Sequence, residues 1–120
     1  MTDNKKADVG DPGLPRNEAE ALHAFQGLQL KKLVANRHKG GWQTISLDKL
    51  VERAEQEMQE MYKALSAYKT ARGTPGFDTE AERIKSRELE IARANLAEEC
   101  ADVANFLLMI ADVTGGLAKP

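Results

Sequence analysis

Residues Glu98–Val113, written EECADVANFLLMIADV, decide the fold of this chain. This stretch predicts a helix, and from Val103 to Val113 apolar side chains occupy almost every face of it. A helix that is apolar all round has to be buried on all sides. Three helices in a chain of 120 residues can hardly bury one of them so completely. We therefore expect an all-α fold, a small helical bundle completed by oligomerisation as a homodimer or homotetramer.

Two of the three helices have clear ends in the sequence. The helix that contains this stretch is predicted to run from about Thr79 to Val113, and Gly115-Gly116 should end it. The first helix should begin at Asn17, an N-cap with Glu20 three residues later as a partial capping box. Its apolar pattern stops at Gly40-Gly41.

The middle helix is predicted from an N-cap at Ser46 to a loop over Arg72–Asp78. Only Gln43–Ile45 could be extended, because strand signals are otherwise nearly absent. The domain is expected over residues 17–116, with a flexible tail at 1–16 and a short tail at 117–120. The middle helix has an apolar stripe with helical period, formed by Leu47, Leu50, Val51, Ala54, Met58, Met61, Tyr62 and Leu65.

Composition excludes several classes of protein. The formal net charge of -2 gives no electrostatic basis for binding polymeric nucleic acid, which favours a basic surface. The single cysteine, Cys100, rules out an internal disulfide and a thiolate zinc site. The longest apolar run, Val103–Val113, is too short to cross a membrane, and no signal segment opens the chain. We expect a cytoplasmic protein that contacts no membrane.

Two pairs of acidic residues stand out on the last two helices. Glu57 and Glu60 are written E-M-Q-E, and Glu99 and Asp102 are written E-C-A-D. Residues three apart lie on the same side of a helix. If the two helices pack together, four carboxylates can surround one cavity. Oxygen ligands of this kind suit Mg²⁺, with Mn²⁺ as a substitute.

The second pair carries more weight than the first. Glu99 and Asp102 lie within or beside the apolar stripe of their helix, where an unpaired carboxylate is costly to bury. Metal ions would offset that cost. By contrast, Glu57 and Glu60 taken alone suit a solvated face, and Glu60 points away from the apolar stripe of its own helix. Asn105 continues the line of acids by one turn and could donate to a phosphate or a sugar.

Basic and aromatic residues supply candidates for substrate binding. His38, Lys39 and Trp42 form the segment H-K-G-G-W, in which the indole could stack on a base and the basic groups could hold phosphates. The alternative, favoured by spacing alone, makes Trp42 a packing anchor at a turn. Lys63 is a further candidate for binding phosphate.

Three stretches together resemble the MazG-like nucleotide pyrophosphohydrolases. They are K-G-G-W at Lys39–Trp42, E-M-Q-E at Glu57–Glu60, and the long string at Glu98–Val113. The resemblance covers roughly His38–Gly116. It implies an all-α fold, dimers or tetramers, and Mg²⁺-dependent hydrolysis of nucleoside triphosphates to monophosphates and pyrophosphate.

Carried over by the same resemblance, the Mg²⁺ ligands would be Glu57, Glu60, Glu99 and Asp102. Glu57 or Glu60 would orient the water that attacks at the α–β junction. The sequence departs from the family pattern at Gln56, where many members have glutamate, and in a rather long loop between the two motifs.

Two other functions compete with this one. The first is a non-catalytic helical oligomer that serves as a nucleotide-binding or protein-interaction module, which Gln56 favours. The second is a di-iron carboxylate bundle, which pairs glutamate with histidine as Glu-x-x-His. Neither histidine of this chain completes that motif.

Overall fold

The computed structural model describes residues 17–73 and 79–118, and these residues are almost entirely helical. They contain no strand, so the all-α prediction is confirmed. The predicted tail at 1–16 and residues 74–78 and 119–120 lie outside the described part. The elements, in order, are α2 (Glu18–Ala35), the 3₁₀ turns η1 (Arg37–Lys39) and η2 (Trp42–Thr44), α3 (Leu47–Gly73) and α4 (Thr79–Val113).

The predicted caps begin α2 and α3. The side-chain Oδ1 of Asn17 accepts a hydrogen bond from the backbone N–H of Glu20 at 3.0 Å. Ser46 Oγ accepts in the same way from the N–H of Lys49 at 3.2 Å. Each cap satisfies a backbone donor that the first turn of a helix leaves without a partner.

The first helix ends earlier than the apolar pattern suggested, at Ala35 instead of near Gly40. Asn36 explains this end, because its side-chain Nδ2 donates to the carbonyl of Lys32 at 2.9 Å. An asparagine side chain that bonds to local backbone competes with the continuation of a helix. The chain then tightens into η1, and Gln43 lies in η2 instead of an extended segment.

The end of α4 matches the prediction from Gly115-Gly116. The N–H of Gly116 donates to the carbonyl of Ala111 at 2.9 Å, and the N–H of Gly115 donates to the carbonyl of Asp112 at 3.0 Å. Gly115 has a φ of 85°, which a glycine adopts without strain. This is the Schellman arrangement that ends a helix with a left-handed residue.

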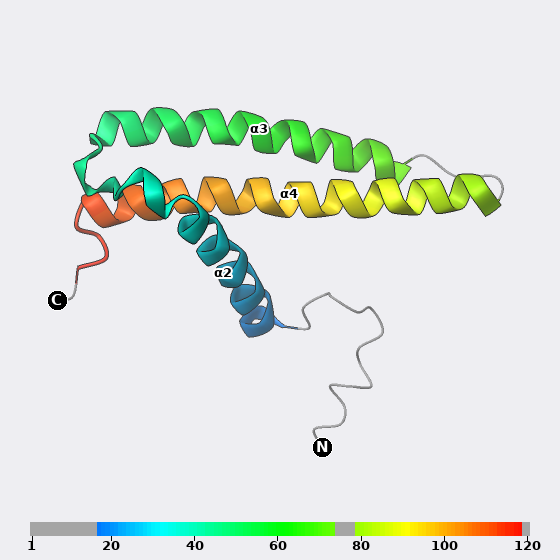
Figure 1. Ribbon diagram of the computed structural model, residues 1–120, viewed down its shortest axis with the longest axis horizontal. Coiled ribbons are helices and arrows are strands. Elements are labelled where there is room, and N and C mark those ends of the chain that lie inside the picture. Colours follow the sequence, from blue (N-terminus) through cyan, green and yellow to red (C-terminus); the bar gives the residue numbers. More distant parts are fainter. Residues whose placement is uncertain (1–16, 74–78, 119–120) are drawn as a thin grey trace, which may run out of the picture.

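The helices form a long hairpin with one helix leaning away from it. In Figure 1, α3 and α4 run antiparallel side by side, while α2 meets α4 near one end and leaves at a steep angle. The described core is small and lies between α3 and α4, where Leu50, Ala54, Ala92 and Val103 are buried. No residue of α2 is buried.

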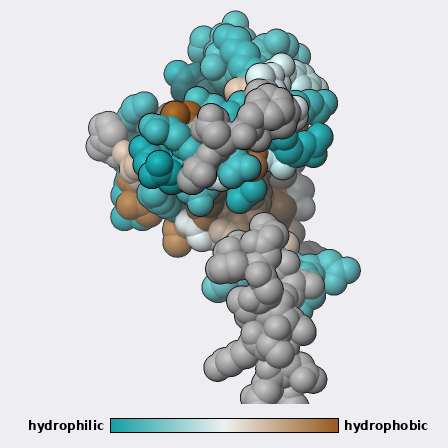
Figure 2. All heavy atoms as spheres, turned by 90° about the vertical axis from the view of Figure 1, so that its right-hand side faces the viewer, coloured by the Kyte–Doolittle hydropathy of each residue, from teal (hydrophilic) through white to brown (hydrophobic). Residues whose placement is uncertain are grey.

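A single chain leaves apolar side chains of the Val103–Val113 stretch exposed, and the all-round burial expected in an oligomer stays a prediction. Val103 is buried, but Leu107 in the same stretch is 53% exposed. The end-on view of Figure 2 shows apolar surface between hydrophilic patches. None of the described helices combines the length and the apolar character needed to cross a membrane. Other large apolar residues left exposed are Leu22, Leu30, Val34, Leu47, Val51, Tyr62, Ile84, Ile91, Val113 and Leu117.

Candidate metal centre

Three of the four predicted acids converge where α3 faces α4. Glu57 of α3 and Glu99 and Asp102 of α4 each offer one carboxylate oxygen, and these oxygens all lie within 4.8 Å of one another. All three side chains are half-buried. We call this group the acid triad.

The local sequence places the triad on the packed side of each helix. Glu57 follows the buried Ala54 by three residues, so it continues the face of α3 that meets α4. Glu99 precedes the buried Val103 by four residues and shares its face of α4. Asp102 lies three residues after Glu99, turned toward α2.

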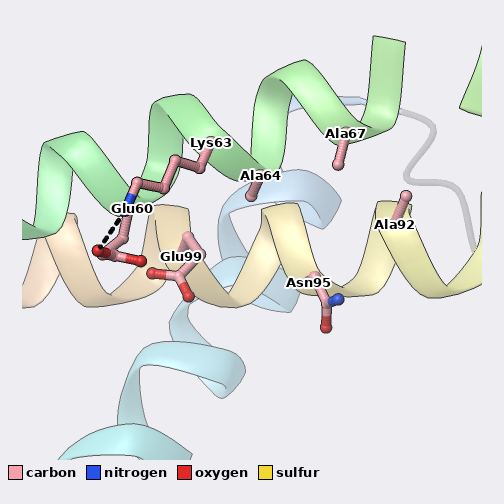
Figure 3. Close-up of a pocket in the computed structure, with 7 residues that line it drawn as sticks. All are labelled: Glu60, Lys63, Ala64, Ala67, Ala92, Asn95 and Glu99. Atoms are coloured by element: carbon pink, nitrogen blue, oxygen red, sulfur yellow. Dashed lines mark hydrogen bonds and ion pairs between the residues drawn. The ribbon is translucent and has the colours of Figure 1, made fainter. Parts of the chain in front are cut away.

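Glu60 lies outside the triad, at its rim. Its carboxylate forms an ion pair with Lys63 at 3.4 Å, and the glutamate side chain is about half exposed. Both residues line a shallow groove of about 410 Å³ between α3 and α4 (Figure 3). Glu99 lines the same groove, so the groove adjoins the triad. The remaining lining residues are Ala64, Ala67, Ala92 and Asn95.

The electrostatics of the triad favour the addition of positive charge. Burial raises the pKa of Glu57, and the nearby charges of Asp102, Glu99 and Glu60 raise it further. Burial also raises the pKa of Glu99, with Asp102 as the next cause. Ionisation of Glu57 and Glu99 is therefore less favourable here than in water. Hard divalent cations prefer several carboxylate oxygens at close spacing, so these residues fit Mg²⁺ or Mn²⁺.

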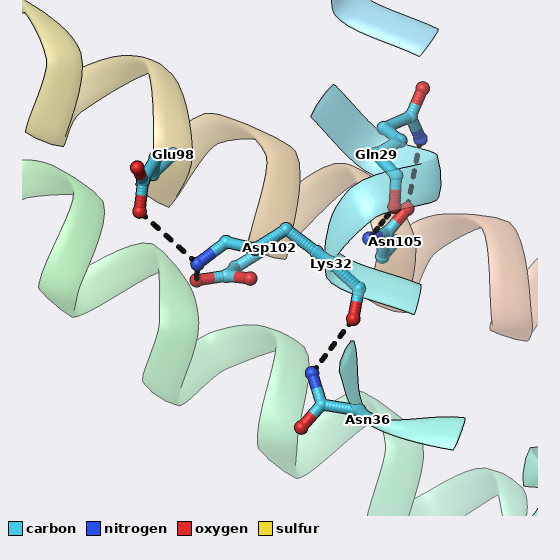
Figure 4. Close-up of polar contacts among 6 residues, drawn as sticks. All are labelled: Gln29, Lys32, Asn36, Glu98, Asp102 and Asn105. Carbon is cyan, nitrogen blue, oxygen red and sulfur yellow. Dashed lines mark hydrogen bonds and ion pairs between the residues drawn. The ribbon is translucent and has the colours of Figure 1, made fainter. Parts of the chain in front are cut away.

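A lysine that the sequence analysis missed lies beside the triad. Lys32 of α2 places its ammonium 3.4 Å from Asp102 Oδ2 and 3.4 Å from Glu98 Oε1 (Figure 4). Burial acts to lower the pKa of Lys32, but attraction to Asp102 and Glu98 outweighs it, and the pKa is raised. The sequence shows only that Lys32 lies on the same side of α2 as Leu28, four residues earlier, and not that this side meets the triad.

Asn105 docks α2 onto α4 in this structure. It is only 4% exposed, and its Oδ1 accepts a hydrogen bond from Gln29 Nε2 at 3.1 Å. Its own Nδ2 donates to the main-chain carbonyl of Gln29, also at 3.1 Å (Figure 4). The amide predicted to contact substrate is thus engaged by α2, and a substrate contact stays a prediction.

The predicted base-binding segment lies away from the triad. Trp42 is half-buried, and its indole Nε1 donates to Asp112 Oδ2 at 3.0 Å. Asp112 follows Asp102 by ten residues, which corresponds to about 15 Å along a helix axis. Lys39 is exposed on η1, and the side chain of His38 lies outside the described part. The structure therefore gives Trp42 an anchoring contact, while the substrate-binding role of this segment stays a prediction.

Comparisons of the chain with protein-family models, with curated proteins and with solved structures returned no match. The resemblance to MazG-like proteins stays a prediction based on the quoted motifs.

Proposed function

We propose that this protein is a Mg²⁺-dependent nucleotide pyrophosphohydrolase, which converts nucleoside or deoxynucleoside triphosphates and water to monophosphates and pyrophosphate. One observation carries the proposal. Two sequence motifs 42 residues apart, counted from Glu57 to Glu99, bring three carboxylate oxygens within 4.8 Å of one another. Such a site suits a hard cation, and hydrolysis of a phosphoanhydride depends chiefly on neutralising phosphate charge.

The residues divide into ligands and a base. Glu57, Glu99 and Asp102 would hold the cation. When bound, Mg²⁺ would neutralise charge on the phosphate oxygens and so favour attack at phosphorus. Glu60 at the rim would orient the attacking water and accept its proton, because its carboxylate lies outside the triad and is about half exposed to solvent. The water oxygen forms a bond to the α-phosphorus, and the bond from that phosphorus to the bridging oxygen breaks. Pyrophosphate leaves beside Lys63.

The test is a screen of the purified protein for pyrophosphate release from all ribo- and deoxyribonucleoside triphosphates, with Mg²⁺ and with Mn²⁺. Glu57→Gln and Glu99→Gln should each lower release by at least about 100-fold, and the double variant should be little worse than either, because the ligands act as one unit. Glu55→Gln, an exposed glutamate on α3, is the matched control and should behave as the parent. No release from any triphosphate, or activity that survives the double substitution, would refute the proposal.

The apolar surface supports a second part of the proposal, that the active form is a homodimer or homotetramer. Leu107 is 53% exposed on α4 in a single chain, and exposed apolar patches commonly mark interfaces. Leu107→Glu should shift the mass measured by light scattering to that of the monomer. A parent protein that is monomeric at micromolar concentration would contradict this.

One observation favours the non-catalytic oligomer as the alternative function. Lys32 already gives Asp102 a positive partner, so the triad has some charge compensation without any metal. An inert module predicts a melting temperature that millimolar Mg²⁺ leaves unchanged. The enzyme predicts a rise, because a ligand that binds only the folded state stabilises it.

A further inference from the structure

Asp102 belongs to two groups at once. One of its carboxylate oxygens converges with those of Glu57 and Glu99, and its Oδ2 lies 3.4 Å from the ammonium of Lys32. That lysine comes from α2, while all three acids of the triad come from the α3–α4 hairpin. The positive charge that pairs with Asp102 is therefore supplied by a different helix.

The second partner of Lys32 is not part of the triad. Glu98 lies 3.4 Å from the same ammonium, and its side chain is 47% exposed. Lys32 can therefore stay paired with Glu98 when its contact with Asp102 is lost. Side chains of Glu98 and Asp102 project from neighbouring turns of α4 (Figure 4). A small movement of the ammonium toward Glu98 would free Asp102.

We propose that Lys32 is the built-in counter-cation of the triad, and that it competes with a divalent cation for Asp102. This inference rests on the proposed metal site. A divalent cation among the three acids takes over the charge of Asp102 and repels the nearby ammonium, because like charges a few ångströms apart repel strongly in a partly buried site. Lys32 then stays paired with Glu98 alone. Lys32 is thus a positioning residue that sets how tightly the triad binds its cation.

The proposal predicts opposite effects of one substitution on stability and on metal binding. Lys32→Met should lower the melting temperature without metal, because it leaves Asp102 and Glu98 without their partner. The same change should tighten Mg²⁺ binding by about tenfold, because it removes both a competitor and a repelling charge. A lysine with a purely structural role would instead weaken metal binding or leave it unchanged when replaced.

The experiment measures Mg²⁺ binding by isothermal titration calorimetry and melting temperature, with Mg²⁺ alone and no nucleotide. Lys31→Met, an exposed neighbour on α2, is the matched control and should change neither quantity. Lys32→Arg keeps the positive charge, so this variant should bind Mg²⁺ about as tightly as the parent does. If Lys32→Met does not fold, Lys32→Arg serves as the folded reference. In that case Lys32→Gln provides the neutral comparison.

A double-mutant cycle tests the exchange directly. Glu98→Gln should weaken Mg²⁺ binding in the parent, since Lys32 then holds Asp102 alone, and should have a much smaller effect in Lys32→Met. Equal effects in both backgrounds would overturn the exchange.

The outcomes separate this inference from the proposed function. Mg²⁺-dependent pyrophosphate release together with unchanged Mg²⁺ affinity in Lys32→Met would overturn the inference and leave the function standing. Mg²⁺ binding that occurs only in Lys32→Met would support the competition and count against the function of the parent. Absence of Mg²⁺ binding in both proteins would overturn both.

Discussion

The α3–α4 hairpin and α2 are held in place by different kinds of contact. Between α3 and α4 lies the buried core, with Leu50 fully inaccessible to solvent. Helix α2 buries no residue and is attached to α4 through the Gln29–Asn105 amide pair and the ion pairs of Lys32. Burial of apolar area dominates the stability of helix packing, and the ion pairs of Lys32 are only partly buried. The hairpin is therefore the stable scaffold, and α2 is a polar attachment to it.

This division also separates the charges of the candidate site. The hairpin supplies all the acids, on a frame whose geometry is fixed by packing. Helix α2, which has no buried residue, supplies Lys32, the ammonium that pairs with Asp102. Three substitutions test the comparison, and the expected effects decrease from the first to the last.

The largest effect should come from the core of the hairpin. Leu50→Ala should lower the free energy of unfolding by about 3 kcal/mol, the usual cost of leucine to alanine at a fully buried position. Leu30→Ala on α2, where the parent side chain is 59% exposed, should cost less than about 0.5 kcal/mol. Urea unfolding followed by circular dichroism measures both. Similar costs at the two positions would show that α2 is as firmly packed as the hairpin.

A middle-sized effect is expected where the two regions join. Asn105→Ala removes both amide hydrogen bonds to Gln29 and should weaken the docking of α2 by about 1–2 kcal/mol. Hydrogen exchange should accelerate in the amides of α2, with little change in those of α3. Asn95→Ala, an exposed asparagine on the same helix, is the control. Uniform acceleration across all three helices would mean that α2 and the hairpin open together.

The smallest effect concerns charge in the triad. The pKa of Glu99 is raised above its ordinary value of 4.5, so the folded protein holds this proton more tightly than the unfolded chain does. Ionisation of Glu99 therefore lowers the free energy of unfolding as the pH rises from 4.5 to the raised pKa. Without metal, Glu99→Gln should melt about 2 °C higher than the parent at pH 7, and the gain should vanish below the ordinary pKa.

Mg²⁺ should reverse the order of these two melting temperatures, because only the parent keeps the full set of ligands. Glu90→Gln, an exposed substitution on α4, should show neither the gain nor the reversal. A Glu99→Gln variant that melts lower than the parent without metal would contradict the electrostatic account of the triad.

Local features of the sequence predicted the helices well. The caps at Asn17 and Ser46 and the glycines after α4 act through neighbouring backbone groups, so the sequence alone reveals them. The bounds Thr79–Val113 of α4 also match the prediction, and the glycines account for its end. The early end of α2 was missed, because it depends on a hydrogen bond from the Asn36 side chain that competes with helix continuation.

The candidate site was predicted only in part. The spacing of Glu57, Glu99 and Asp102 was sufficient to predict that they would meet, because each is tied to the packed face of its helix. The contacts of Lys32 and Asn105 depend on where α2 crosses α4, and helical periodicity carries no information about that crossing. Glu60 lies one turn beyond Glu57, yet an adjacent lysine holds its carboxylate at the rim.

Trp42 is the chain's single tryptophan, and its indole bonds to Asp112 at the end of α4. All tryptophan fluorescence of the protein therefore originates at the connection between α2 and α3. An unfolding curve recorded by fluorescence reports the release of this connection, whereas circular dichroism reports the three helices. Coincident midpoints would indicate a single cooperative transition. A lower midpoint by fluorescence would measure, in the unmodified protein, how far the connection opens while the hairpin is still folded.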